Sequence, residues 1–230
     1  MDNTEARAAQ AAADQLAERQ AVYDAASIDV PVPDDGVIDY LLVGDSLANG
    51  AAATTPALSF REIVGAQLAA KATVNSVLAG KAGQGIDLIA PQALKAGSDF
   101  DVIVVEVGTN DVTTSNPTQA EAAAFADSYI RFLSELRSQS PAAALVCLGP
   151  WRNADVASAF EEAVEVACTE QGGKFRALSK HYTVKENRWR DGSMPDGTPT
   201  DNFHPSDLGH ADIASEVLSA LRLDRARPSA

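Results

Sequence analysis

Residues 37–47 read Val37-Ile38-Asp39-Tyr40-Leu41-Leu42-Val43-Gly44-Asp45-Ser46-Leu47, an apolar run that stops at a glycine, an acid and a serine. The run lacks the 3.6-residue period of a helix, which is typical of a central strand in a parallel sheet. Ser46 would then lie at the carboxyl end of that strand, where open α/β sheets bind ligands. Serine is also a favoured helix N-cap, so Ser46 alone leaves both interpretations open.

Strands and helices alternate along the rest of the chain. Further strands are predicted over 73–78, 101–107, 143–148 and 174–178, and helices over 60–70, 85–94, 118–138, 155–171 and 206–221. Five strands separated by helices predict an α/β fold, with a parallel sheet covered by helices on both faces. With the strand order 2-1-3-4-5, the topological switch lies between the first and third strands. Residues 179–203 are expected to form a long irregular segment, and segments of this kind are usually functional or mobile.

Composition and charge limit the class of protein. With 230 residues, of which 46% are hydrophobic, the chain is long enough for one sizeable core. A net charge of −14 argues against nucleic acid and anionic membranes as partners. No run of about 18 apolar residues occurs, so no integral membrane association is expected. A cytoplasmic location is the default in the absence of a signal-peptide pattern, and a secreted or virion-associated protein stays an alternative.

Residues 1–36 are expected to form an N-terminal helix and a linker, and residues 37–230 the folded domain. The helix, over 4–26, has few large apolar residues, so it is expected to pack on the domain, to associate with a second copy or partner, or to fray. Cys147 and Cys168 have neither C-x-x-C spacing nor a disulfide-rich frame, and we interpret them as small core residues.

Chemistry-bearing residues follow the predicted strands. Gly80 comes after the second strand and Asn110 after the third, and Asp201 and His204 stand just before the last helix. The three-residue spacing lets the Asp201 carboxylate accept from Nδ1 of His204, which leaves Nε2 as a base for a serine. Oxyanion donors would be the backbone N–H groups of Ser46 and Gly80 and the side-chain amide of Asn110.

Four sequence blocks together resemble the GDSL, or SGNH, hydrolase family over residues 38–221. They are Gly44-Asp45-Ser46-Leu47, Gly80 after Val74-Asn75, Gly108-Thr109-Asn110-Asp111, and Asp201-Asn202-Phe203-His204-Pro205. The resemblance implies a three-layer α/β/α flavodoxin-like fold and hydrolysis of acyl esters or thioesters without a metal or other cofactor. It makes Ser46 the nucleophile, His204 the base and Asp201 its orienter, with Gly80 and Asn110 in the oxyanion hole. Gly83 and Gly85 lie in the same loop as Gly80 and compete for its place.

The expected substrate is a small-molecule acyl ester, with the acyl group on a small alcohol, a carbohydrate or a lipid, cleaved through a covalent acyl-serine. A thioesterase, an acyltransferase and a non-catalytic binding or assembly module with the same fold stay open. The G-x-S-x-G elbow of the α/β-hydrolases is absent, because Ala48 stands two places after Ser46 where that motif has glycine. This removes the nearest rival serine-hydrolase fold.

A metal site is not expected, because His181, His204 and His210 lack i, i+4 spacing. We expect His210 to pack or to hydrogen-bond in the last helix. Asp111 could be an acceptor within its turn or a support for the site, and we favour support. Trp151, Arg152, Arg188, Trp189 and Arg190 are candidates for a specificity surface.

Overall fold

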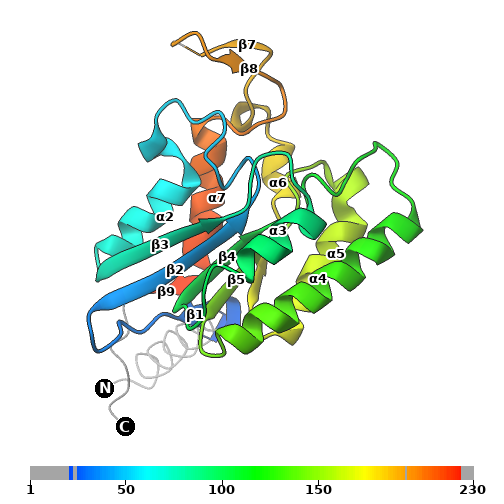
Figure 1. Ribbon diagram of the computed structural model, residues 1–230. Coiled ribbons are helices and arrows are strands. Elements are labelled where there is room, and N and C mark those ends of the chain that lie inside the picture. The colour runs from blue at the N-terminus through cyan, green and yellow to red at the C-terminus, as the bar shows by residue number, and fades with distance from the viewer. Residues whose placement is uncertain (1–20, 23–24, 195, 224–230) are drawn as a thin grey trace, which may run out of the picture.

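The computed structural model describes residues 21–22, 25–194 and 196–223 (Figure 1). The helix expected over 4–26 lies mostly outside these residues, so its association with the domain or with another chain stays a prediction. Among the described residues, no helix is long and apolar enough to cross a membrane.

A five-stranded parallel sheet forms the centre of the domain. Its strands are β2 (Val37–Gly44), β3 (Thr73–Ala79), β4 (Val102–Glu106), β5 (Ala144–Leu148) and β6 (Lys174–Arg176), in the order β3-β2-β4-β5-β6. Counted along the chain within this sheet, the order is the predicted 2-1-3-4-5. Every residue of β4 and β5 is buried, as their Val-rich and Leu-rich sequences indicate for strands covered on both faces.

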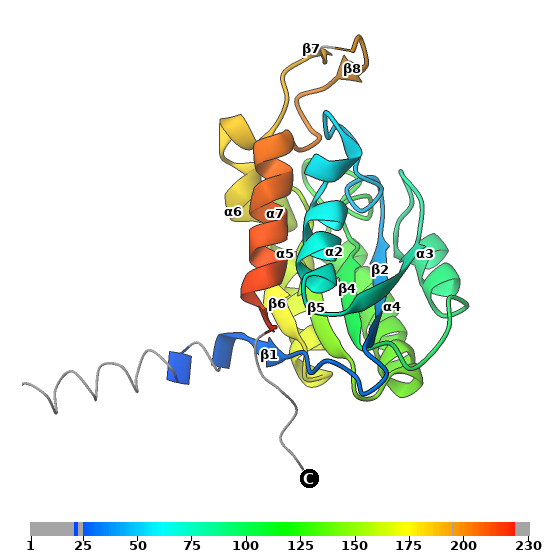
Figure 2. The same cartoon turned by 90° about the vertical axis from the view of Figure 1, so that its left-hand side faces the viewer.

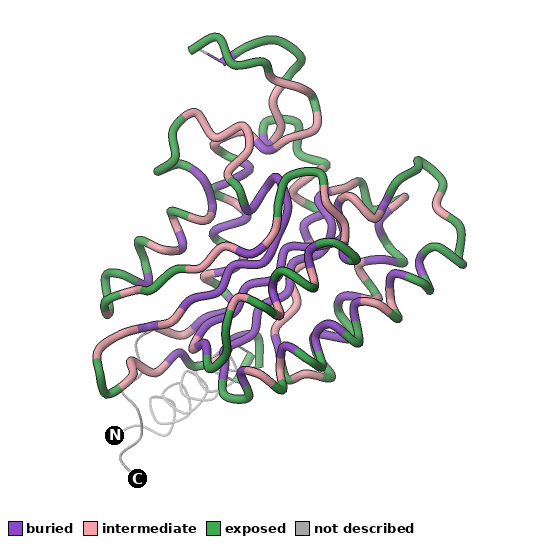
Figure 3. The backbone as a smooth tube through the Cα atoms, in the orientation of Figure 1, coloured by how far each residue is buried: buried purple, intermediate pink, exposed green. Residues whose placement is uncertain are grey.

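Helices cover both faces of the sheet, which gives the predicted three layers (Figures 1 and 2). Side chains alternate along the strands, and each face has its own apolar cluster. Leu41, Val105 and Cys147 pack with α3 (Ile86–Ala93), α4 (Gln119–Gln139) and α5 (Ala154–Glu170). Leu42 and Val104 pack on the other face with α2 (Phe60–Ala69) and α7 (Asp207–Ser219). The central strands β2, β4 and β5 are therefore buried between the helices, whereas the edge strands β3 and β6 are more exposed, as Figure 3 shows.

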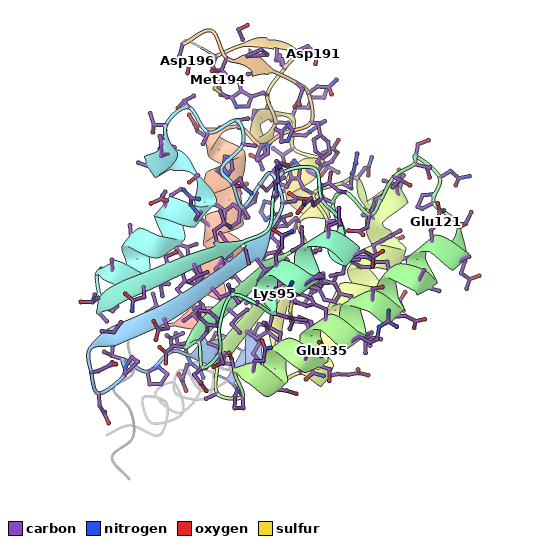
Figure 4. The ribbon with its side chains drawn as sticks, viewed as in Figure 1. Lys95, Glu121, Glu135, Asp191, Met194 and Asp196 are labelled. Atoms are coloured by element: carbon purple, nitrogen blue, oxygen red, sulfur yellow. A yellow bond between two sulfur atoms is a disulfide. The ribbon has the colours of Figure 1, made fainter. Side chains whose placement is uncertain are left out.

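The segment expected to be irregular, residues 179–203, contains local structure. It forms α6 (Ser179–Tyr182), the 3₁₀ helix η2 (Lys185–Asn187) and a small antiparallel hairpin of β7 (Gly192–Ser193) and β8 (Pro199–Thr200). A second 3₁₀ helix, η1 (Pro56–Leu58), precedes α2. Asp191, Met194 and Asp196 lie in or beside the hairpin, which projects beyond the carboxyl edge of the sheet (Figure 4).

The interpretation of the two cysteines is wrong in one respect. Both are fully buried, but they form a disulfide that joins β5 to α5, across a sequence separation of 21 residues. No short motif marks this pair, because the two sulfurs meet only after α5 has packed on the sheet. A crosslink of this loop length stabilises a fold by about 3 kcal/mol in the chain-entropy description.

Residues 28–30, assigned above to the linker, pack onto the domain. β1 (Ile28–Asp29) pairs in parallel with β9 (Leu221–Arg222), and Arg222 Nε donates to Asp29 Oδ1 at 2.7 Å. Val30 is buried in the α2–α7 cluster. The packed part of the described chain therefore begins before residue 37.

Candidate active site

Ser46 lies in the turn that follows β2, at the carboxyl edge of the sheet, and is 7% exposed. The turn is tight because β2 ends in a glycine: a Cβ on Gly44 would lie 2.5 Å from the Cβ of Ala48 and 2.9 Å from the carbonyl oxygen of Glu106. Gly44 pairs with Glu106 of β4, so the turn is held against the neighbouring strand. Ser46 therefore lies at the topological switch point of the sheet, between the carboxyl ends of β2 and β4.

His204 connects Ser46 to Asp201. His204 Nε2 lies 3.1 Å from Ser46 Oγ, and His204 Nδ1 lies 2.7 Å from Asp201 Oδ2. The other carboxylate oxygen, Oδ1, accepts from the backbone N–H of His204 at 2.7 Å and of Phe203 at 3.0 Å. Partial burial by itself raises the pKa of Asp201, but these hydrogen bonds outweigh it and hold that pKa below its usual range. Asp201 is therefore an anion that orients the imidazole.

Aromatic packing fixes the loop that carries His204. Trp151 is fully buried and donates from Nε1 to the carbonyl oxygen of Phe203 at 2.8 Å. Tyr182 contacts both the Trp151 and the Phe203 rings, and the Phe203 ring packs edge-on against the His204 ring. Trp151 therefore supports the catalytic loop from inside and cannot form an exposed specificity wall.

Asn110 lies beside Ser46, with both hydrogens of its amide engaged. Nδ2 donates to Asp45 Oδ2 at 2.7 Å and to the carbonyl oxygen of Gln84 at 3.1 Å. These contacts tie the amide to the residue before Ser46 and to the loop after β3. To donate to an oxyanion, the amide has to share or release one of them.

Gly80 approaches the end of β2 very closely. Its φ of +128° is a conformation that side-chain-bearing residues rarely adopt, and a Cβ there would lie 2.0 Å from the carbonyl oxygen of Gly44. Gly83, with nothing near its Cβ position, and Gly85, which caps α3, do not make this approach. The geometry therefore favours Gly80 over its two neighbours as the glycine of the site.

Two buried acids lie behind the nucleophile, and the sequence reasoning assigned neither of them a role. Asp45 and Glu106 are both fully buried, and the backbone N–H of Asp45 donates to Glu106 Oε2 at 3.3 Å. Asp45 Oδ1 accepts from the backbone N–H of Leu47 at 3.1 Å and lies 3.4 Å from Ser46 Oγ. Burial raises the pKa of Asp45, and burial together with the Asp45 charge raises that of Glu106 well above its usual range. Of the two acids, Glu106 therefore has the pKa that is shifted more strongly toward the protonated form.

Glu106 also connects the site to the strand next to β4. Thr109 Oγ1 lies 3.3 Å from Glu106 Oε1, and the same hydroxyl accepts from the backbone N–H of Trp151 at 2.9 Å. An acid within the apolar Val-Ile run of β4 is the sequence signal that marks Glu106, because a buried carboxyl needs partners.

Asp111 and His210 take supporting positions, as expected. The two carboxylate oxygens of Asp111 accept from the backbone N–H of Ile86 at 3.0 and 3.2 Å, at the start of α3. Burial is the main cause that raises the Asp111 pKa to about 6. His210 is buried between the backbone N–H of Phe60 and the carbonyl oxygen of Ala51.

His181 bonds to Asp212 and Glu216, outside the site. Within the described residues, no group of three or more His, Cys, Asp or Glu side chains is arranged to hold a metal ion.

An open cavity of about 520 Å³ adjoins the His204 loop. Arg188, Trp189 and Arg190, three of the specificity candidates, line it, together with Thr200 and Ser206 on either side of the Asp201–His204 segment. The Trp189 ring is fixed by a 2.7 Å hydrogen bond from Nε1 to the carbonyl oxygen of Ala52. The fifth candidate, Arg152, lies apart from this cavity.

Comparison with known proteins gives a family match and structural neighbours. The GDSL-like Lipase/Acylhydrolase family matches residues 42–211. Curated protein sequences give no significant match. Similar solved structures include an extracellular lipase from Streptomyces rimosus (TM-score 0.55, 17% identity, 80% of this chain and 99% of that chain). An acetyl xylan esterase, AlAXEase, has a TM-score of 0.58 and 18% identity, over 79% of this chain and 98% of that chain.

A third neighbour is a carbohydrate esterase family 2 enzyme plus carbohydrate binding domain from Corynascus thermopiles (Myceliophthora fergusii), with a TM-score of 0.57 and 17% identity. The match covers 81% of this chain and 65% of that one, so this chain corresponds to only part of that protein. At these identities the neighbours establish the fold, and the family match establishes the relationship. The matched residues include Ser46, Asn110 and His204, and the chain belongs to the GDSL-like lipase/acylhydrolase family, as a carboxylic ester hydrolase of the GDSL type.

Proposed function

We propose that the protein hydrolyses small acyl esters through a covalent acyl-serine at Ser46. The observation that carries this proposal is the His204 imidazole between Ser46 Oγ, at 3.1 Å, and the Asp201 carboxylate, at 2.7 Å. A serine hydroxyl is a weak nucleophile at neutral pH unless an adjacent base takes its proton. An imidazole held in one tautomer by an anion is such a base.

In the first half-reaction, Ser46 Oγ bonds to the ester carbonyl carbon while its proton passes to His204 Nε2. The carbonyl oxygen becomes an oxyanion, for which the backbone N–H groups of Ser46 and Gly80 and the amide of Asn110 are the proposed donors. The carbon–oxygen bond to the alcohol then breaks. His204 gives its proton to the leaving oxygen, so an alcohol departs and an acyl-serine stays.

In the second half-reaction, a water molecule replaces the alcohol. His204 Nε2 takes a proton from the water as its oxygen bonds to the acyl carbon, and the same donors stabilise the second oxyanion. The bond to Ser46 Oγ breaks, and the proton returns from His204 to the serine. The products are a carboxylic acid and the free enzyme, without any metal or other cofactor in the scheme.

The experiment is an ester series with a mechanistic control. 4-Nitrophenyl esters from acetyl to long-chain acyl groups, acetylated sugars and an acyl-CoA thioester should be compared for wild type and Ser46→Ala. We expect hydrolysis by wild type only, and labelling of Ser46 by a fluorophosphonate probe, which should fail in His204→Ala. A folded wild-type protein that neither turns over any substrate nor reacts with the probe would favour the non-catalytic module instead.

We also infer that the protein matures in an oxidising compartment, which favours the secreted alternative over the cytoplasmic default. The buried Cys147–Cys168 disulfide supports this, because such bonds are rare where cellular thiols are kept reduced. Alkylation of free thiols at the moment of cell lysis, followed by mass measurement, tests it. Two alkylated cysteines in the active protein would contradict the inference.

A further inference from the structure

Arg152 is fixed at the junction of two parts of the active site. It follows Trp151 directly after β5, and its Nε donates to the carbonyl oxygen of Thr109 at 3.2 Å. Its guanidinium carbon lies 4.5 Å from the centroid of the Phe203 ring. Thr109 immediately precedes Asn110 and Phe203 immediately precedes His204, so the guanidinium contacts both segments that carry the proposed oxyanion donor and the base.

The rest of this guanidinium is unused. A guanidinium has five N–H donors, and within the described residues only Nε of Arg152 has a hydrogen-bond partner. Arg137 differs, because its Nε and Nη1 donate to four backbone carbonyl groups. In a chain with 32 acids and 18 bases, Arg152 is also without a carboxylate partner in the described part. Its terminal nitrogens, Nη1 and Nη2, are therefore available to a ligand.

Three acids of the site are already engaged by other groups. Asp201 accepts from His204 and Phe203, and Asp111 accepts from the backbone N–H of Ile86. Asp45 is fully buried and accepts from Leu47 and Asn110. None of these carboxylates contacts Arg152, so its charge is not neutralised by an ion pair within the site.

We propose that Arg152 binds a carboxylate on the substrate, so that the preferred esters are anionic. This rests on the proposed esterase function and adds the substrate class to it. The planar fork of a guanidinium matches the two oxygens of a carboxylate, and the contacts through Nε and the Phe203 ring pre-orient that fork. The carboxylate belongs either to the acyl half or to the alcohol half of the ester.

Matched pairs of substrates distinguish the two halves. For the acyl half, the 4-nitrophenyl monoester of glutaric acid is compared with 4-nitrophenyl valerate, which has the same chain length without the charge. For the alcohol half, 4-acetoxybenzoate is compared with its methyl ester. The measured quantity is the ratio of kcat/KM for the anionic ester to that for the neutral ester, which cancels general effects on the catalytic groups.

We expect wild type to favour the anionic member of one pair. Arg152→Gln should lower that ratio by about 10–100-fold, the range for losing a charge-assisted hydrogen-bonding partner. Arg152→Lys should retain part of the preference, because it keeps the charge but not the fork. Arg131→Gln is the matched control: it removes the same charge from an exposed position on α4 and should leave the ratio unchanged.

A structural role alone predicts a different result. If Arg152 only braces Thr109 and Phe203, Arg152→Gln slows both members of each pair equally and the ratio stays constant, which overturns the proposal. The absence of any anionic preference in wild type overturns it as well.

A binding measurement is independent of turnover. Calorimetric titration of Ser46→Ala with monomethyl glutarate and with methyl 4-carboxyphenyl ether should show binding of at least one, which Arg152→Gln in the same background abolishes. If no ester is hydrolysed but this binding occurs and depends on Arg152, the proposed function fails while the carboxylate site stands. If neither compound binds, the carboxylate site is wrong.

Discussion

Replacement of Asn110 by alanine tests the oxyanion hole, because the structure shows both the role that the amide can take and the contacts that it has to give up. Loss of one oxyanion donor lowers kcat by about 10²–10³-fold. In the resting structure, however, the amide donates to Asp45 Oδ2 at 2.7 Å and to the carbonyl oxygen of Gln84 at 3.1 Å. Release of the neutral bond to Gln84 costs about 1 kcal/mol, or roughly a factor of five. The net loss that we expect for Asn110→Ala is therefore about 20–200-fold in kcat, with little change in KM.

The matched variant is Asn110→Asp, which keeps the shape of the side chain. It places a second carboxyl group against Asp45, and two unit charges 4 Å apart repel by about 4 kcal/mol at an effective dielectric constant of 20. The variant can relieve this repulsion only by binding a proton. We expect kcat at pH 7 to fall at least as far as in Asn110→Ala, and the free energy of unfolding to be lower at pH 7 than at pH 5.

The assay is steady-state hydrolysis of the best 4-nitrophenyl ester, with urea unfolding of each variant to show that the protein is folded under assay conditions. If Asn110→Asp turns over the ester almost as fast as wild type, the side chain merely stabilises the turn, where aspartate is a good substitute. The oxyanion role would then have to be given up.

Three further outcomes are expected. Removal of residues 1–30 should lower the midpoint of thermal unfolding below that of a protein that lacks residues 1–24, because only the longer deletion removes β1 and the buried Val30. Equal midpoints for the two truncated proteins would show that the β1–β9 pair adds nothing. The double substitution of Cys147 and Cys168 by alanine should lower the free energy of unfolding by about 3 kcal/mol. A mild reductant should leave the activity of the native protein unchanged because both cysteines are buried, and rapid inactivation by reductant would contradict their burial. The pKa of Asp111 is raised to about 6 in the folded protein, so the native state binds more protons than the unfolded state between about pH 4 and 6, and the contribution of Asp111 to the free energy of unfolding is lost as pH rises through that window. Asp111→Asn should remove this pH-dependent contribution, which urea titrations across the window measure, and identical pH profiles for the two proteins would count against it.

The fold was predictable because its signals are local and repeated. β4 and β5 are short Val-rich or Leu-rich runs, and α4 carries a complete Thr118–Glu121 capping box at its start. The strand order came with the flavodoxin-like fold that the family resemblance implies, because alternation of strands and helices alone leaves the order open. The disulfide was missed for the opposite reason, because nothing near Cys147 or Cys168 in the sequence reports that α5 brings them together.

The site was predictable to the extent that each residue terminates a strand or precedes a helix. Ser46 and His204 are brought within hydrogen-bonding distance although 158 positions separate them. The Asp45–Glu106 pair was not predicted, although Glu106 stands in the apolar run of β4, because only the three-dimensional packing shows that Asp45 is its neighbour. Likewise, the contact of the Asn110 amide with Gln84 depends on a loop conformation that residue types alone do not specify.

The pairing of β1 with β9 has a consequence for how the protein can be immobilised or fused to another protein. These two strands lie together at the end of the sheet where the strands begin, whereas Ser46 lies where they end (Figure 1). A tag or fusion partner attached upstream of Ile28 or downstream of Arg222 would thus hold the domain by the end of the sheet opposite Ser46. On a bead, a cell surface or a fused scaffold, either point of attachment would leave the edge of the sheet that carries Ser46 directed away from the support and accessible to substrate.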